Sequence, residues 1–468
     1  MAQDYTEWVE KEIKSSEGLE KIVERIKATK EQRCLIVSHD DPDGIVSALI
    51  LKRLLDKLGA EVDYFFPPSY ILTKEQLAST VKKKKYELLF ILDKGTTSYY
   101  DEHTMIIKDI VVIDHHFPDL PEGPPKKCLL YNPNSNPQAE EYIGCSTSLL
   151  THMIATTLGL KEDYDDFLCF IGLKGDFAID PATGEVSKFA QSFYETYEKN
   201  FKNLLTPLKS RPTMFDITQR EKTSLLSRIT ELIHGTCGGG FQYFYNDRAK
   251  SLKGVDQVDL LFTSLSKYGR RNPKISNLKR LDHFLGEIPY RWVIQQLYKY
   301  YLRDWENASH LLDSTISIGK MGRVAIQLFI GENVPLLPMV GSVKLHDLTK
   351  EWSEKHVLLV MVNKEPDGGT HFSLRATSDR IHCGKICHTL ASRLVRKYGF
   401  PDLITGGGHS RAAECNTRTA PAPTPAAILA FFRLYEQLRD LSLRADKNGL
   451  RKREREIAID LGLDYLKS

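Results

Sequence analysis

The stretch that decides the fold runs from Cys34 to Gly59 and reads CLIVSHDDPDGIVSALILKRLLDKLG. Cys34–Ser38 is a short apolar run that predicts a buried strand, and Ile45–Leu58 has the spacing of a helix that ends at Gly59. Six residues, three of them Asp, join the two elements: His39-Asp40-Asp41-Pro42-Asp43-Gly44. A strand that leads directly into a helix is typical of the first half of a βαβ unit.

The same alternation continues to about residue 180. Further strands are predicted at Val62–Phe66, Glu87–Leu92, Ile110–Ile113 and Cys128–Tyr131, and a further helix at Ser146–Leu158. Strands separated by helices predict an α/β fold with a doubly wound, mostly parallel sheet.

After residue 186 the predicted secondary structure changes twice along the chain. Residues 187–320 carry long helical stretches such as Asp282–Leu312, whose aromatic residues we interpret as core packing: Trp292, Tyr298, Tyr300, Tyr301 and Trp305. Strands return at Val324–Ile330, Val357–Asn363 and His371–Thr377, and a helix at Gly384–Tyr398 and a glycine loop follow. We therefore expect a domain at 1–186 with an N-terminal helix, a mainly helical middle region at 187–320, a smaller α/β domain at 321–432 and a charged helical tail at 433–468.

Composition limits the class of protein. The 468 residues are 41% hydrophobic and 27% charged, and 64 Lys or Arg against 61 Asp or Glu leave a net charge of only +3, which excludes a histone-like binder. The longest apolar run, Ala426–Phe432, is far shorter than the roughly 20 residues that span a bilayer. The first thirty residues lack a signal-peptide pattern, so we expect a cytoplasmic protein without a membrane partner. The eight cysteines are scattered, which favours buried thiols.

Four short segments place metal-binding side chains at the ends of predicted elements. They are His39–Gly44, Asp93 after the strand Glu87–Leu92, Asp114-His115-His116 after the strand Ile110–Ile113, and Asp176 after an apolar helix. Ligands bind beyond the carboxyl ends of parallel strands, so these segments are expected to meet. So many carboxylates cannot share one site without cations, and two divalent ions would relieve the repulsion. Mixed imidazole and carboxylate ligands favour Mn²⁺ over Mg²⁺. Taken singly, His39–Gly44 also fits a turn with a helix cap, and Asp93 a loop residue.

In combination, Asp114-His115-His116 and the upstream His-x-Asp-x-Asp-Gly resemble the DHH phosphoesterase superfamily. Leu403–Ala413 reads LITGGGHSRAA and is similar to the Gly-Gly-Gly-His signature of the associated DHHA1 domain, and Ser373-Leu374-Arg375 is similar to its Ser-x-Arg strand. The resemblance covers roughly residues 33–180 and 320–432, and among members it is to archaeal RecJ-like single-strand exonucleases.

The resemblance implies a role for each matching residue. His39 and Asp41 would bind one metal ion, Asp43, His115 and Asp176 the other, and Asp93 would bridge them. Asp114 would orient a histidine, and His116 would contact the scissile phosphate. Arg375, Gly406, Gly407, Gly408 and His409 would bind a substrate phosphate, with the active site in the cleft between the two domains. The cofactors would be two divalent ions, Mn²⁺ first, with Mg²⁺ or Co²⁺ as alternatives.

The expected activity is a metal-dependent phosphodiesterase, in first place a Mn²⁺-dependent exonuclease that hydrolyses single-stranded DNA or RNA from an end. One alternative is a nanoRNase-like hydrolase of short oligonucleotides or cyclic dinucleotides. Another, of a different class, is a replisome-associated DNA-binding or assembly factor with replication or repair proteins as partners. The resemblance assigns no role to Lys94 or to residues 187–320.

A basic stretch in the middle region bears on the substrate. Arg248–Arg280 holds nine Lys or Arg residues against two Asp, with aromatic residues beside or among them: Tyr243, Phe244, Tyr245, Phe262 and Tyr268. Such a track suits single-stranded nucleic acid, and Arg270, Arg271 and Lys274 are its candidate contacts. The alternative is a solvated basic face with core aromatics.

Overall fold

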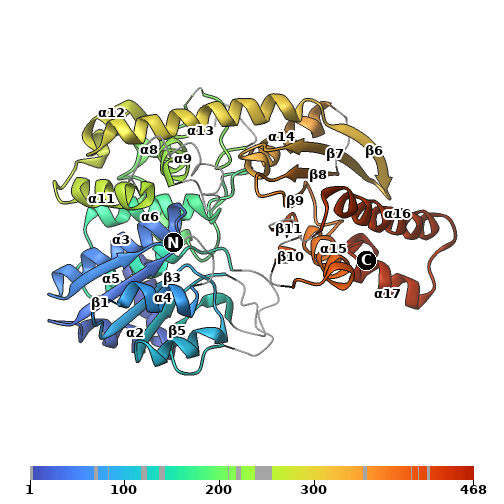
Figure 1. Ribbon diagram of the computed structural model, residues 1–468. Coiled ribbons are helices and arrows are strands. Elements are labelled where there is room, and N and C mark those ends of the chain that lie inside the picture. Colours follow the sequence, from blue (N-terminus) through green and yellow to red (C-terminus); the bar gives the residue numbers. More distant parts are fainter. Residues whose placement is uncertain are drawn as a thin grey trace. The chain divides into compact units, whose positions relative to one another are not determined.

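The computed structural model describes residues 4–67, 72–82, 84–116, 124–135, 143–208, 210–217, 223–237, 256–351, 356–401, 403–408, 410–418 and 422–467, with the backbone alone at 346–351 and 448. The chain divides into two compact units, Met1–Lys299 and Tyr300–Ser468 (Figure 1). Among these described residues, no helix is long and apolar enough to cross a membrane.

The first unit contains a five-stranded sheet whose neighbouring strands are all parallel. Its order is β2-β1-β3-β4-β5, with the bounds β1 Arg33–Ser38, β2 Glu61–Phe65, β3 Leu88–Leu92, β4 Asp109–Ile113 and β5 Leu129–Tyr131. The predicted doubly wound parallel sheet is therefore confirmed. In this order the chain changes direction across the sheet between β1 and β3, which is where ligands bind in such folds.

Helices cover both faces of this sheet. On one face lie α3 Pro42–Lys57, α5 Thr147–Thr157 and α6 Asp163–Gly175, which pack closely on one another. On the other face, alternate strand residues such as Leu35, Leu89 and Val112 form a core with α4 Lys74–Val81 and η1 Ser98–Met105. Because successive strand residues point to opposite faces, strands such as β3, which is wholly apolar, are buried on both sides.

The N-terminal segment forms two short helices, α1 Tyr5–Ser15 and α2 Glu17–Lys27. Helix α1 contacts α5, where the buried Tyr5 hydroxyl lies 2.8 Å from His152 Nδ1, and α2 contacts β5. Both helices are therefore part of the first unit.

The middle region is helical, as predicted. Its helices are α7 Gln191–Tyr197, α8 Lys202–Leu205, α9 Leu225–Cys237, α11 Gln257–Gly269, η3 Ile275–Asn277, α12 Leu281–Glu287 and α13 Arg291–Leu312. Helix α9 packs on α6, and α11 contacts α3. The predicted continuous helix over 282–312 is wrong, because Pro289 separates α12 from α13 and disfavours helical backbone at the residue before it. Tyr301 and Trp305 are buried as predicted, but Trp292 is 73% exposed and is not a core residue.

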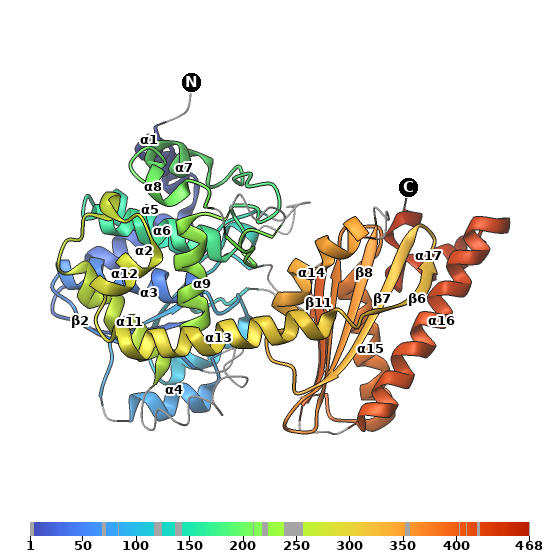
Figure 2. The ribbon, with the colours of Figure 1, turned by 90° about the horizontal axis from the view of Figure 1, so that it is seen from above.

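The second unit is built on a six-stranded sheet in the order β10-β11-β9-β8-β7-β6. The bounds are β6 Ile316–Met321, β7 Val324–Glu332, β8 Val357–Lys364, β9 Thr370–Ala376, β10 Ile404–Gly408 and β11 Ala412–Thr417. Only β7 and β8 pair in parallel. Figure 2 shows α14 Leu337–Glu351 on one face and α15 Cys383–Tyr398 with α16 Thr424–Asn448 on the other.

The segment expected as a glycine loop is strand β10, paired with β11. Glycine has a low strand propensity, so the pattern hides the strand. The absence of a side chain is required there: a Cβ on Gly406 would lie 2.4 Å from the Cys387 carbonyl oxygen of α15.

The C-terminal helices belong to the core of this unit. Helix α16 continues through residue 432 and buries Leu434 and Leu438 against the sheet, and α17 Lys452–Asp460 and η4 Asp464–Leu466 follow it.

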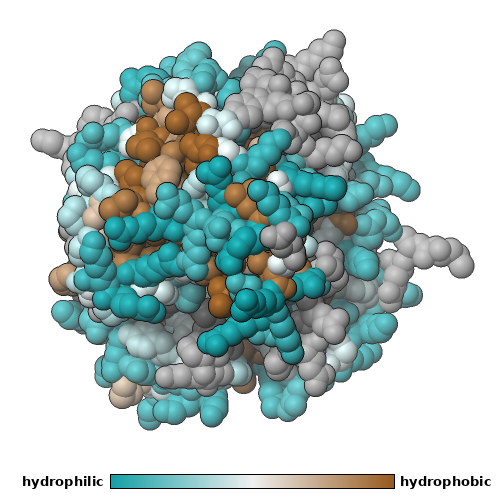
Figure 3. All heavy atoms as spheres, turned by 90° about the vertical axis from the view of Figure 1, so that its right-hand side faces the viewer, coloured by the Kyte–Doolittle hydropathy of each residue, from teal (hydrophilic) through white to brown (hydrophobic). Residues whose placement is uncertain are grey.

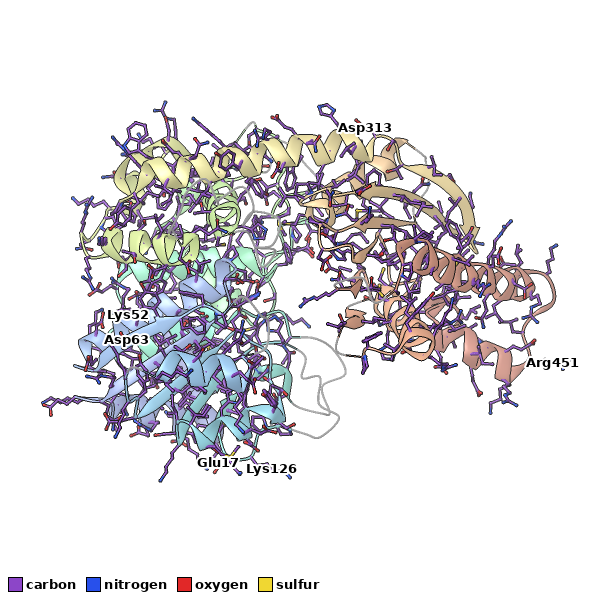
Figure 4. All side chains as sticks on the ribbon, viewed as in Figure 1. Glu17, Lys52, Asp63, Lys126, Asp313 and Arg451 are labelled. Atoms are coloured by element: carbon purple, nitrogen blue, oxygen red, sulfur yellow. The ribbon has the colours of Figure 1, made fainter. Side chains whose placement is uncertain are left out.

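After α13, Asp313 accepts a hydrogen bond from Lys344 Nζ of α14 at 2.6 Å (Figure 4).

Some large apolar residues of this unit are exposed. They are Leu311, Ile316, Ile330, Phe400, Leu429, Leu443 and Ile457. Figure 3 shows apolar side chains gathered in one part of a largely hydrophilic face.

Candidate metal centre

The carboxyl ends of β1, β3 and β4, the first turn of α3 and the end of α6 bring seven metal-binding side chains together. They form three overlapping groups, in each of which one ligand atom per residue lies within 4.8 Å of the others: His39, Asp41, Asp93; Asp43, Asp93, His115, Asp176; and Asp93, His115, His116. Asp93 is common to all three groups. All of these residues were singled out in the sequence, and the partition into a His39–Asp41 side and an Asp43–His115–Asp176 side is the one that the resemblance implied.

Asp93 is fully buried and follows β3 directly. Its φ of 57° lies in the left-handed region, which costs about 1 kcal/mol or more for a residue with a Cβ. Its backbone N–H donates to the Ile113 carbonyl at 3.1 Å, and its Oδ1 accepts a hydrogen bond from Thr147 Oγ1 at 3.2 Å. The surrounding structure therefore holds this carboxylate in a strained position, as is common at functional sites.

The two carboxylate oxygens of Asp41 make different contacts. Its Oδ1 accepts a hydrogen bond from the Gly44 amide at 2.8 Å and so caps α3, while its Oδ2 lies 3.1 Å from His39 Nδ1. The capping and ligand interpretations of this segment are thus compatible. Gly44 is needed for the tight turn, since a Cβ there would lie 2.3 Å from the His39 carbonyl oxygen.

Asp43 lies in the first turn of α3 and contacts the beginning of α5. Its carboxylate accepts hydrogen bonds from the backbone amides of Thr147 at 2.6 Å and Ser148 at 3.0 Å. A helix N-terminus favours an anion there. On the other side Gly172 of α6 leaves room for the carboxylate, because a Cβ would lie 2.2 Å from Asp43 Oδ1.

Asp176 caps the C-terminal end of α6, and its Oδ2 lies 2.5 Å from His115 Nε2. This Oδ2 makes no hydrogen bond of acceptable geometry within the described part of the chain, although the ion-pair distance is short. Both atoms belong to the group of ligand atoms that includes Asp43 and Asp93.

The carboxylate of Asp114 contacts the imidazole ring of His116. Its Oδ1 lies 2.9 Å from His116 Nδ1, and its Oδ2 accepts hydrogen bonds from Thr96 Oγ1 at 2.8 Å and Asn132 Nδ2 at 3.2 Å. Burial raises the pKa of Asp114, but the nearby His116 outweighs burial and the net pKa lies below its ordinary value. Asp114 is thus an ionised acceptor placed against the imidazole of His116.

The gathered carboxylates repel one another. Burial, with Asp41 and Asp43 next, raises the pKa of Asp93 well above its ordinary value, and burial with Asp43 does the same for Asp176. Burial lowers the pKa of His115, but Asp93 reverses this and brings it to about 9. Asp93 Oδ2 is buried and accepts no hydrogen bond from the described residues. A site with excess buried negative charge and an unsatisfied carboxylate oxygen fits divalent cations.

Thr147, Asn132 and His234 of the site were not foreseen, and Lys94 was noted in the sequence without a role. Thr147 and Asn132 are described above, and Asn132 follows β5, so the same argument from strand ends could have identified it. Lys94 is fully buried; burial lowers its pKa to about 8, and Asp40 opposes the shift most strongly. His234 of α9 is also buried, which lowers its pKa to about 4, with Asp41 acting in the opposite direction. No local pattern marks His234, because it comes from the middle region.

The predicted phosphate-binding residues lie in the second unit. Arg375 on β9 donates to Ser342 Oγ at 3.1 Å and Glu414 Oε1 at 3.2 Å, and it pairs in register with Ala412 of β11. On the far side of β11 lies β10, which holds Gly406, Gly407 and Gly408. A Cβ on Gly407 would meet no described atom within 4 Å. His409 lies outside the described residues.

The basic stretch is partly described. Arg270, Arg271 and Lys274 are exposed. Phe262 and Tyr268 are buried, at 1% and 2% exposed, so their interpretation as stacking platforms is wrong and the alternative of core aromatics is right. The three other aromatic residues of the predicted track, Tyr243, Phe244 and Tyr245, lie outside the described residues.

Comparison with known proteins gives one family match and several relatives. Residues 33–170 match the DHH family, N-terminal domain. The chain is 25% identical over 121 residues to the single-stranded-DNA-specific exonuclease RecJ of Bacillus subtilis (strain 168), which is 24% of this chain and 15% of that protein. The chain therefore spans only a small part of this curated relative.

Solved structures share the fold. The RecJ–Mn²⁺ complex of Thermus thermophilus has a TM-score of 0.55 at 15% identity, over 90% of this chain and 55% of that one. The DHH domain of a member of the s1p family of ribosomal proteins has a TM-score of 0.58 at 16% identity, over 91% of both chains. Exonuclease RecJ bound to manganese has a TM-score of 0.52 at 17% identity, over 95% of this chain and 98% of that one. Residues 33–170 are therefore a DHH-family N-terminal domain. The chain that contains this domain is related to RecJ.

Proposed function

We propose that this protein is a metal-dependent phosphodiesterase, and specifically an exonuclease on single-stranded DNA or RNA. The observation that carries the proposal is the convergence of His39, Asp41, Asp43, His115 and Asp176 around Asp93. The relative that is a single-stranded-DNA-specific exonuclease and the structural relative described as exonuclease RecJ with manganese support the choice of reaction and substrate.

The donor set suggests where two ions would bind. His39 and Asp41 would hold one divalent ion, Asp43, His115 and Asp176 the other, and Asp93 would contribute to both. Mn²⁺ is the favoured ion, with Mg²⁺ and Co²⁺ as alternatives. When bound, such a pair supplies an activated water at neutral pH and stabilises the charge that develops on the phosphate oxygens.

Side chains of each unit would contact the substrate. His116, held at Nδ1 by Asp114, would use its Nε2 to contact the scissile phosphate. Arg375 would offer its guanidinium to a second phosphate, and Gly407, around which the described structure leaves open space, would let backbone amides approach the same group. Hydrolysis needs no covalent intermediate with the protein, since water is the attacking group.

The test is a time course with end-labelled 20-mer DNA and RNA and with a dinucleotide, each in Mn²⁺, Mg²⁺ or chelator. Stepwise shortening of the 20-mers that requires a divalent ion would support the exonuclease, and the label would give its polarity. Cleavage of the dinucleotide alone would assign the protein to short fragments instead. No cleavage of any substrate, with metal bound, would contradict an enzymatic role and leave a nucleic-acid-binding or assembly factor.

The matched variants are Asp93→Ala and Asp63→Ala. Asp63 is a half-buried carboxylate on the edge strand β2 of the same sheet, where it accepts hydrogen bonds from Lys84 and Tyr86 (Figure 4). Loss of Asp93 should abolish turnover and bound Mn²⁺, whereas loss of Asp63 should leave both unchanged. Substantial activity in the Asp93→Ala protein would contradict the two-metal assignment.

A further inference from the structure

A surface at the junction of α11, α12 and α13 combines exposed aromatic rings with cations. Trp292 is 73% exposed and Tyr290 is 46% exposed, although aromatic side chains of this size usually pack inside. Tyr290 has a φ of 57°, so the turn between α12 and α13 holds it in an uncommon backbone conformation. Both rings belong to the first unit.

Cations accompany both rings. Lys267 Nζ lies 4.8 Å from the centroid of the Tyr290 ring and donates to its hydroxyl at 2.8 Å. The Arg291 guanidinium lies 5.2 Å from the Trp292 ring centroid. These contacts fix the rings at low cost, and each ring still presents surface to solvent.

Two further features lie in the chain segments next to these rings. Arg271 Nη1 donates to the Glu287 carbonyl at 3.2 Å, which ties the end of α11 to the end of α12. Close by in the chain, a surface pocket of about 380 Å³ is lined by Asn277, Lys279, Arg280 and His283. We call the surface formed by Lys267, Arg271, Tyr290, Arg291 and Trp292 the basic–aromatic surface.

Charge is concentrated in this segment. Residues 267–299 contain eight Lys or Arg residues and two acidic ones, a net charge of +6, whereas the whole chain has a net charge of only +3. All eight cations of the segment are exposed, including Arg270 and Lys274 of the predicted track. A positive surface of this density favours a polyanion.

From this geometry we propose that the basic–aromatic surface binds the single-stranded part of a nucleic-acid substrate, with Trp292 and Tyr290 as platforms on which unpaired bases stack. The proposal rests on the nucleic-acid substrate of the proposed function and adds the place where the strand is held away from the metal centre. Aromatic faces stack on any unpaired base, and the adjacent cations contact the backbone phosphates. A duplex keeps its bases within the helix, so it would use the cations but not the rings.

The decisive experiment measures binding of a labelled 20-mer of single-stranded DNA, and of a 20-base-pair duplex, by fluorescence anisotropy in the presence of chelator. Trp292→Ala should weaken single-strand binding about 5- to 150-fold, the range that loss of one stacked base predicts, and should change duplex binding little. Arg271→Ala with Arg291→Ala should reduce the slope of log affinity against log salt by about 1.4, since each lost phosphate contact contributes about 0.7.

Two control variants remove the same kinds of side chain, an exposed aromatic ring and a pair of exposed cations, at other places in the protein. Phe400→Ala removes another exposed aromatic ring, and Lys452→Ala with Arg453→Ala removes two exposed cations from the N-terminal part of α17, next to Arg451 (Figure 4). Neither should affect binding. Because Trp292 is exposed, its loss should not lower the melting temperature, and Trp292→Phe should restore much of the affinity.

The outcomes separate this proposal from the proposed function. Unchanged single-strand affinity in Trp292→Ala, while the wild-type protein cleaves the 20-mer, overturns the basic–aromatic surface and leaves the exonuclease intact. It would point to a protein partner for these rings. Weakened single-strand binding in Trp292→Ala, when the wild-type protein cleaves nothing, would support the surface and contradict the enzyme. Equal loss on the duplex would contradict stacking and leave only a charge contact.

Discussion

Asp114 Oδ1 lies 2.9 Å from His116 Nδ1, and the other oxygen of the same carboxylate accepts hydrogen bonds from Thr96 and Asn132. Three donors around one buried carboxylate favour its ionised form, which only accepts hydrogen bonds. The proton of the His116 imidazole therefore lies on Nδ1 in the neutral ring, and Nε2 is available to a ligand. We propose that Asp114 sets both the tautomer and the orientation of the ring.

Replacing Asp114 with Asn should lower turnover with little change in shape. An amide can donate to Nδ1 as well as accept, so it no longer selects the tautomer, and we expect kcat to fall about 10- to 100-fold. Steady-state kinetics on a dinucleotide would measure this, and Mn²⁺ titration should show that metal affinity falls less than turnover. A variant with normal kcat would contradict the orienting role of Asp114.

A second prediction concerns the close approach of α6 to Asp43. A Cβ on Gly172 would lie 2.2 Å from Asp43 Oδ1 and 2.0 Å from Ser148 Oγ, so Gly172→Ala must displace the carboxylate or the helix. We expect a loss of about 1–3 kcal/mol in the free energy of unfolding and weaker Mn²⁺ binding. Urea unfolding and calorimetric metal titration would measure the two effects.

The control for that variant is Gly286→Ala. Gly286 lies in α12, and a Cβ there would meet no described atom within 4 Å. The substitution should leave metal affinity unchanged and stability equal or slightly higher, since alanine restricts the unfolded chain. Equal effects of the two variants would show that the Asp43 contact does not matter.

The sequence predicted the parallel sheet and the candidate ligands because both follow from local rules. A polar residue directly after a buried strand must lie at the carboxyl edge of the sheet, so Asp93 and Asp114 could be placed without coordinates. Pro289 could have marked the break between α12 and α13 by the same kind of reading. The same rules identified β7, β8 and β9 of the second unit, whose residues are mainly buried.

The remaining features depend on packing between distant segments. His234 comes from a helix more than a hundred residues beyond the strands, and no spacing links it to His39. The strand β10 is hidden by its glycines, which are explained only by the approach of α15 to Gly406. Phe262 and Trp292 are both aromatic residues in helices, yet one is buried and the other exposed, because burial depends on which face of the helix its neighbours cover.

A third prediction addresses the second unit. If Arg375 binds a substrate phosphate, Arg375→Ala should raise KM more than it lowers kcat, and we expect about a tenfold increase in KM or more. Arg411→Ala is the control, because Arg411 lies beside the same sheet but is exposed and paired with Asp379 at 2.7 Å. If both variants raise KM equally, the effect reflects general positive charge rather than a phosphate site at Arg375.

A final prediction concerns pH and stability. His371 is buried between Glu365 and Glu414, at 3.4 Å and 3.0 Å from their carboxylates. Burial lowers the pKa of His371, but Glu414 outweighs it and brings the pKa to about 9. Burial raises the pKa of Glu414, but His371 outweighs it and the net pKa falls to about 2. In the folded protein His371 is therefore protonated and Glu414 ionised throughout the neutral range.

The direction of the pH dependence follows from comparing the pKa values in the folded protein with those in the unfolded chain. The stabilisation from protonated His371 is complete below its unfolded pKa of about 6.5 and is lost as pH rises through about 9, whereas that from Glu414 is complete above about 4.5 and is lost as pH falls toward about 2. The free energy of unfolding should therefore drop by on the order of 2 kcal/mol between pH 6.5 and 9. Urea unfolding of His371→Gln should lack that slope, and Arg411→Ala should retain it. An identical slope in wild type and His371→Gln would show that His371 does not carry the charge that the two glutamates require.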